Sequence, residues 1–187
     1  MAGERVKIIS QKVDEKYINI CRYHGQTLRW EVHKPHVQAT AWIEGNTLML
    51  RGSIDGQPVS WEKPLQDRIW KQPLSYALRN VARGNVQEER FLCLRPDTLE
   101  PVEMQARRMG IDEVCIEGQT LSAVHVRIRL DGFLSMLWHG DYWFRTTDHV
   151  LLRYTGVNGP PGTAKTVIDL MGEDLCWKTC LCTLKTQ

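Results

Sequence analysis

The sequence predicts a mainly β protein, built on one large, curved, antiparallel sheet of half-barrel type with one short helix. Three observations lead to this class. Apolar and polar residues alternate with period two over most of the chain, turn residues separate these runs, and only one segment has helical spacing. The chain has 187 residues and a formal net charge of +2. This length allows a sizeable core and predicts a single mostly β domain over residues 1–187.

The first half of the chain predicts a series of hairpins. In residues 28–32 (LRWEV) the three apolar side chains fall on one face and the two charged ones on the other. The pair at 45–46 (GN) indicates a turn. The pair at 55–56 (DG) favours positive φ at both positions, which is typical of a two-residue hairpin. The expected strands here cover 17–23, 28–32, 37–43 and 47–54, with Val59 and Trp61 continuing after the second turn.

One segment, residues 73–83, has the spacing of a helix. Pro73 suits the first turn of a helix, and Gly84 suits the position just past its end. Between them four apolar residues form one stripe: Leu74, Ala77, Leu78 and Val81. Because the stripe is short, the helix is expected to pack against the sheet or to plug its mouth.

The second half predicts further strands, at 89–94, 99–108, 111–117, 121–130, 133–144, 150–155 and 165–170. The pair at 131–132 (DG) predicts another two-residue hairpin. In that register His125 lies opposite Trp138. Arg127 lies opposite Met136, so neither face of the hairpin is purely polar. We therefore expect both faces to be covered, one by the helix and loops and the other by sheet curvature or a ligand.

Aromatic side chains are the candidates for a ligand site, because the chain has seven tryptophans. Sheet cores accept aromatic rings readily, so packing accounts for most of them. A curved sheet lined by such rings is also able to hold an apolar ligand. The residues expected to line its concave side are Trp42, Trp61, Trp70, Met136, Trp138 and Trp143.

Two patterns, one of arginines and one of cysteines, allow both a functional and a purely structural interpretation. Four arginines are candidates for an anion-holding face, Arg127, Arg129, Arg145 and Arg153, although such a row is more often a solvated surface. Three cysteines near the end, Cys176, Cys180 and Cys182, would supply most of a zinc site, but their spacing matches no common zinc motif and free thiols are preferred. No catalytic residue and no cofactor is expected, and a non-catalytic module is preferred over the competing class, an enzyme or nucleotide-binding protein that uses Lys165 and Thr166.

Residues 159–166 (GPPGTAKT) resemble the phosphate-binding loop of AAA-type ATPases. In such a loop Gly162 would contribute its backbone amide, Lys165 would reach the phosphates, and Thr166 would hold Mg²⁺. However, only 21 residues follow Thr166 (187 minus 166), and the preceding chain does not alternate strands with helices. A proline–glycine connection between two strands is preferred, and nucleotide binding is the disfavoured alternative.

Composition also bears on partners and location. The near-neutral charge predicts no nucleic-acid partner, and no apolar run reaches the roughly 18 residues of a membrane span. No secretory leader is recognised, which predicts a cytoplasmic location as the chain is written, or the bacterial envelope if a leader has been removed. An unpaired sheet edge would offer a further function, a protein–protein interaction or a homodimer.

A family resemblance is carried by residues 141–145 (DYWFR), 151–156 (LLRYTG) and 159–162 (GPPG), with 95–99 (RPDTL) opening an earlier hairpin. The chain looks like a family of uncharacterised bacterial proteins built on a large curved antiparallel sheet. These resemble in turn the half-barrel lipoprotein carriers of the bacterial envelope, whose sheet wraps an acyl chain. The resemblance implies a non-catalytic binding module for an apolar or lipid-like ligand, and it implies no catalytic residue.

Overall fold

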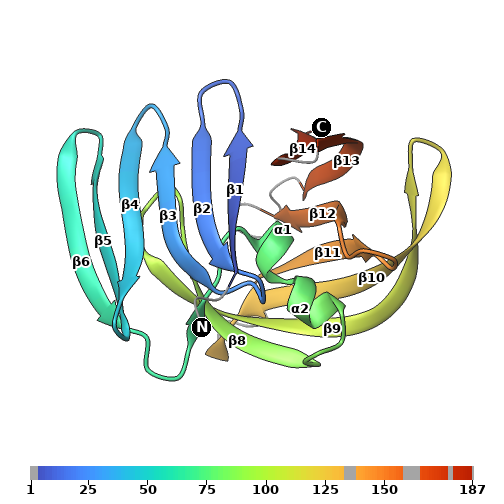
Figure 1. Cartoon of the computed structure of the whole chain (residues 1–187), viewed down its shortest axis with the longest axis horizontal. Coiled ribbons are helices and arrows are strands. Elements are labelled where there is room, and N and C mark those ends of the chain that lie inside the picture. The colour runs from blue at the N-terminus through green and yellow to red at the C-terminus, as the bar shows by residue number, and fades with distance from the viewer. Residues whose placement is uncertain (1–3, 133–137, 158–164, 177–178, 187) are drawn as a thin grey trace. The chain divides into compact units, whose positions relative to one another are not determined.

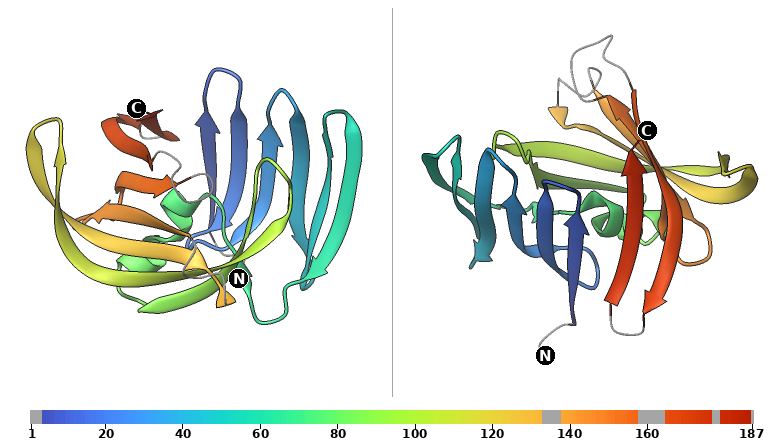
Figure 2. Two further views of the ribbon diagram at one scale, coloured as in Figure 1. Left: turned by 180° about the vertical axis from the view of Figure 1, so that it is seen from behind. Right: turned by 90° about the horizontal axis from the view of Figure 1, so that it is seen from above.

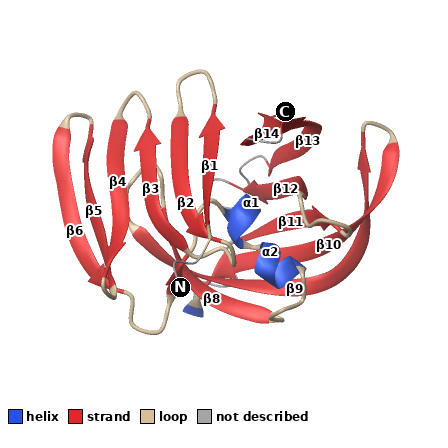
Figure 3. Ribbon diagram, in the orientation of Figure 1, coloured by secondary structure: helices blue, strands red, loops and turns tan. Residues whose placement is uncertain are grey.

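The computed structural model describes residues 4–132, 138–157, 165–176 and 179–186, with side chains described as far as Met171. It confirms the mainly β class, since strands make up 66 % of the chain and the helices are short (Figure 3). The chain divides into two compact units, residues 1–77 with 90–103, and residues 78–89 with 104–187. The expectation of one domain concerns independent folding, which this division does not test.

The first unit contains a six-stranded meander: β1 (Arg5–Gln11), β2 (Lys16–Arg22), β3 (Thr27–His33), β4 (Val37–Glu44), β5 (Thr47–Ile54) and β6 (Gln57–Pro64). Each strand pairs with the next in antiparallel order (Figure 1). Asp55 and Gly56 form the expected two-residue turn between β5 and β6, with φ of 49° and 76°. Such positive φ values match the twist of the flanking strands.

One face of this meander carries the core of the first unit. Its strands contribute Trp30, Val32, Ala39, Ala41, Leu48 and Leu50. Two further strands, β7 (Ile69–Trp70) and β8 (Glu88–Leu94), form a parallel pair whose residues Trp70, Leu92 and Leu94 pack into the same cluster. This face of the sheet is therefore covered by the chain's own side chains.

Gln72 makes the polar connections of this core. Its backbone carbonyl accepts from Thr27 Oγ1 at 2.6 Å, and its side-chain oxygen accepts from Trp70 Nε1 at 2.8 Å. The side-chain amide also bonds with the backbone of Leu94 in both directions, at 3.2 and 3.3 Å. Buried polar groups are costly unless they are hydrogen-bonded. Gln72 provides partners for donors and acceptors that would otherwise be unpaired inside the apolar cluster.

The second unit contains most of a second meander: β9 (Pro101–Ile116), β10 (Gln119–Leu130), β11 (His139–Arg145), β12 (Leu151–Val157), β13 (Lys165–Cys176) and β14 (Thr179–Thr186). Their hydrogen-bonded order is sequential, β9 to β14, and the series continues through β8 to β7. The strands therefore form two sheets, where the sequence predicted one. Figure 2 shows the last two strands, in red, side by side as a hairpin.

One bulge replaces a predicted break. The sequence indicated two strands separated at Gly110, but β9 runs through this position as one strand. Opposite β10, His125 pairs with Gly110 and Val126 pairs with Arg108, so Met109 is the extra residue of a β-bulge. Gly110 has a φ of 148°. A bulge lets the ladder bend and continue, whereas a turn would have ended it.

The register between β10 and β11 corrects the predicted hairpin. His125 lies opposite Trp143 rather than Trp138, and Arg127 lies opposite Asp141. The connection is longer than the two residues at 131–132, because β11 begins only at His139. The difference is an odd number of residues, so every β11 side chain meets β10 on the opposite face from the one expected. Met136 lies outside the described residues.

The predicted helix over 73–83 is two four-residue helices, α1 (Leu74–Ala77) and α2 (Arg79–Ala82), interrupted at Leu78. In the first unit, Gly25 approaches α1 so closely that a Cβ there would lie 2.7 Å from the Ala77 carbonyl oxygen. In the second unit, α2 packs against β10, and Gly84 follows it with a φ of 79°. The expectations of packing on a sheet and of a glycine stop are confirmed for α2.

Candidate functional site

Along β10, one face of the second unit's sheet changes from apolar to cationic, while the neighbouring strands place Arg145 opposite Ala123 and Arg153 opposite Trp143 on the same face. On β10 this face carries Leu121, Ala123, His125, Arg127 and Arg129 in that order. We call it the His125 face. The partners of these residues on β9 and β11 lie on the same face, because directly paired residues in a sheet point the same way.

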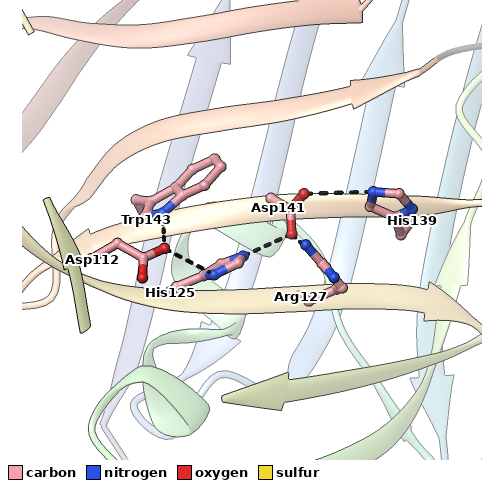
Figure 4. A network of polar contacts seen from close by, with 6 residues as sticks. All are labelled: Asp112, His125, Arg127, His139, Asp141 and Trp143. Atoms are coloured by element: carbon pink, nitrogen blue, oxygen red, sulfur yellow. Dashed lines mark hydrogen bonds and ion pairs between the residues drawn. The ribbon is translucent and has the colours of Figure 1, made fainter. Parts of the chain in front are cut away.

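His125 is held between two carboxylates at the centre of this face (Figure 4). Its Nε2 lies 2.7 Å from Asp141 Oδ1, and its Nδ1 lies 3.1 Å from Asp112 Oδ2. The imidazole is nearly buried, with 8 % of its surface exposed. Since both ring nitrogens face a carboxylate, neither is free to act as a general base towards a substrate.

Asp141 is the most connected group of the network. Arg127 donates from Nε to its Oδ1 at 2.7 Å, and His139 Nε2 lies 3.7 Å from its Oδ2. Burial alone would raise the pKa of Asp141, but hydrogen bonds from His125 and Arg127 outweigh it and lower the pKa to about 2. The carboxylate therefore remains charged at any pH near neutrality.

Trp143 stands beside the network and is fixed at two points. Its indole Nε1 donates to Asp112 Oδ2 at 3.0 Å, and its ring stacks on His125 with centroids 4.8 Å apart. The ring is only half-buried. A partly exposed indole that cannot rotate offers a preformed apolar contact, because little side-chain entropy is lost when something binds to it.

The apolar end of the His125 face adjoins a small core. Its buried members are Val114, Ile116, Ala123, Leu152 and Leu170. Three half-buried side chains pack on it, Leu121, Trp143 and Val150. These three present apolar surface next to the charged centre of the face. The arrangement suits a ligand with an apolar part and a polar part better than a purely apolar one.

The structure does not bring the predicted lining residues together. In the first unit, Trp70 is fully buried in the core, and half-buried Trp61 packs on the same cluster and donates Nε1–H to the Leu99 carbonyl. Trp42 lies on the other face of that sheet, where the Arg51 guanidinium sits 5.7 Å from its ring centroid. The interpretation of the tryptophans as core applies directly to Trp70.

In the second unit, Trp138 and Trp143 also lie on opposite faces. A Cβ on Gly140 would lie 3.3 Å from the Trp138 ring, and Gly140 lies on the opposite face of β11 from Trp143. Gly140 pairs with Gly156, and the Tyr154 ring covers both positions. Two facing glycines leave room for aromatic rings to lie flat on the strands. Trp138 therefore belongs to an aromatic cluster, away from the His125 network.

Two residues of the disfavoured nucleotide loop lie within the described part of the chain. Lys165 and Thr166 are the first residues of β13, paired with Val157 and Gly156. A phosphate-binding loop needs a helix to begin there, so that backbone N–H groups point at the phosphates. The strand interpretation of this segment is the one that fits. Gly162 lies outside the described residues.

Among the described residues, no group of three or more His, Cys, Asp or Glu side chains is arranged to hold a metal ion. The side chains of Cys176, Cys180 and Cys182 lie outside the description. No helix in the described ranges has the length or apolarity needed to span a bilayer.

The polar network was not predicted from the sequence. Arg127 was singled out, but Asp112 and Asp141 were not assigned to it, because the expected register placed other residues beside His125. The sequence signal for Asp141 is the alternation of side chains along the two strands, since the correct register places Asp141 opposite Arg127. No family model, curated protein or solved structure matches the chain. The site is therefore interpreted from its own geometry.

Proposed function

We propose that this chain is a non-catalytic binding module for a lipid-like ligand, which lies along the His125 face. The observation that supports this proposal most is the order of side chains along the His125 face, which is partly exposed. Leu121 supplies apolar contact at one end, Trp143 extends it to the centre beside His125, and Arg127 begins the charged end. A ligand with a hydrocarbon part and a polar head matches that order.

The chemistry of the site favours binding over catalysis. Both nitrogens of His125 are engaged, and Asp141 is neutralised by Arg127, so the network holds its own groups in place. Such mutual pairing fixes orientation, which is the property of a preorganised binding surface. The same function is implied by the resemblance to envelope lipoprotein carriers. Pairing through a sheet edge and the cellular location stay predictions.

The test is calorimetric titration of the protein with lysophosphatidylcholine below its micellar concentration. Trp143→Ala is expected to weaken binding about tenfold, because stacked apolar area is removed at the centre of the contact. Trp143→Phe keeps an aromatic ring and is expected to bind nearly as the wild type does. Trp42→Ala removes a half-buried tryptophan from the first unit and is the matched control.

Tryptophan fluorescence of the wild-type protein provides a second readout. The emission maximum is expected to shift to the blue and to saturate with lysolipid, because the bound ligand would shield the half-exposed Trp143 ring from water. Absence of any heat or spectral change up to the micellar concentration of the lysolipid would overturn the proposal. Equal weakening by Trp42→Ala and Trp143→Ala would move the ligand away from the His125 face.

A further inference from the structure

The cationic end of the His125 face places two arginines directly opposite each other and a third arginine opposite a histidine. Arg107 on β9 pairs with Arg127 on β10, and Arg129 pairs with His139 on β11. Directly opposed side chains in a sheet have Cβ atoms about 5 Å apart, and like charges at that distance are destabilising. We call these four residues the basic cluster. Its arrangement carries a cost in the free protein.

Little counter-charge is available to offset that cost. Asp141 accepts from Arg127 through Nε, while no described residue accepts from the terminal nitrogens of Arg127. Arg107 and Arg129 form no hydrogen bond or ion pair with any residue in the described ranges, and His139 is 52 % exposed. Several guanidinium donors at neighbouring positions therefore have no partner among the described residues.

The other arginines of the predicted row are different. Arg153 makes a two-pronged ion pair with Asp169, and Arg145 makes one with Asp148. These two arginines have the carboxylate partners that arginine forks prefer. The other two arginines of the row have fewer partners, because Arg127 bonds to Asp141 through Nε alone and Arg129 has no partner among the described residues. Their remaining guanidinium donors are available for a ligand.

We infer that the basic cluster binds an anionic oxygen group, a phosphate ester or a carboxylate, which forms the charged head of the ligand. Guanidinium forks match such groups with two parallel hydrogen bonds, and a bound anion removes the repulsion between Arg107 and Arg127. The identification of this anion as a lipid head rests on the proposed function. The anion site itself rests on the register and on the unpaired donors.

The experiment compares three probes by calorimetry at low ionic strength: lysophosphatidic acid, lysophosphatidylcholine with the same acyl chain, and inorganic phosphate. The wild-type protein is expected to bind lysophosphatidic acid about tenfold more tightly than lysophosphatidylcholine. Arg107→Gln and Arg129→Gln are each expected to remove most of this preference. Neither substitution breaks a described contact, and Arg107→Gln removes the repulsion with Arg127, so both variants are expected to be at least as stable in urea as the wild type.

Lys7→Gln is the control, since it removes the same charge from an exposed position of the first unit. Equal affinity for the two lysolipids, unchanged by the arginine variants, overturns the anion site and leaves the proposed function standing. Binding of phosphate that depends on Arg107 and Arg129, without lysolipid binding, supports the anion site and overturns the lipid function. Absence of binding to all three probes overturns both.

Discussion

The imidazole of His125 lies nearly parallel to the indole of Trp143, with ring centroids 4.8 Å apart and planes inclined by 16°. The two residues are directly opposite each other on β10 and β11. Because the stack fixes the plane of the imidazole, its two nitrogens are held towards Asp112 and Asp141. The indole and the imidazole thereby orient each other, and both remain at the boundary between the apolar and cationic ends of the His125 face.

Acid is expected to weaken the second unit through Asp141. The pKa of Asp141 is lowered from 3.8 to about 2 in the folded protein. The stabilisation is complete above the unfolded pKa, and it is lost as pH falls from about 4 towards 2, at a cost on the order of 2 kcal/mol. Urea unfolding of the wild type and of Asp141→Asn checks this. The variant should lose less stability than the wild type over the same pH range, and an equal loss in both proteins would contradict the role of Asp141.

Replacing Gln72 is expected to destabilise the first unit. Gln72→Met keeps the volume but leaves Trp70 Nε1–H and the Leu94 backbone without their buried partners. Unpaired buried groups cost roughly 1–3 kcal/mol each, so the expected loss is about 3 kcal/mol in the free energy of unfolding. Gln38→Met changes an exposed position of β4 and should lie close to the wild type. A loss below about 1 kcal/mol for Gln72→Met would contradict its role in the core.

Two glycines with positive φ should respond differently to alanine. At Gly25, with φ of 90°, the new Cβ would lie 2.7 Å from the Ala77 carbonyl oxygen. At Gly45, with φ of 61°, nothing lies within 4 Å. Gly45→Ala is expected to cost about 1 kcal/mol through φ alone. Gly25→Ala should cost clearly more, because the backbone of α1 must move. Thermal unfolding of both variants measures the difference, and equal losses would mean that the close approach is relieved without cost.

Among the three cysteines with described side chains, Cys115 is expected to react first with a maleimide. Burial raises the pKa of Cys21 to about 11 and that of Cys93 to about 12, so almost none of either thiol is ionised near pH 8. Cys115 is exposed. Mass spectrometry of peptides from briefly labelled protein gives the order. Labelling of Cys21 at the rate of Cys115 would indicate that the first unit opens readily in solution.

Much of the strand pattern could be predicted because it depends on neighbouring residues. The turns at 45–46 and 55–56 follow from residue pairs that favour positive φ, and β5 has the predicted bounds of Thr47–Ile54. β1 was missed, since the adjacent Ile8 and Ile9 interrupt the alternation. The helix was expected to be continuous, but Leu78 takes the turn conformation between α1 and α2.

The candidate site depends on registers that no local pattern specifies. Trp143 meets His125, and Arg107 meets Arg127, only because of where β11 begins and where Met109 bulges. The sequence alone determined the β class and the tight turns, since these follow from short-range conformational preference. Its composition also determined which aromatic and basic side chains were present. Tertiary structure decided which of those side chains share a face, because pairing between strands joins residues far apart in the chain and a slip of one residue reverses every face.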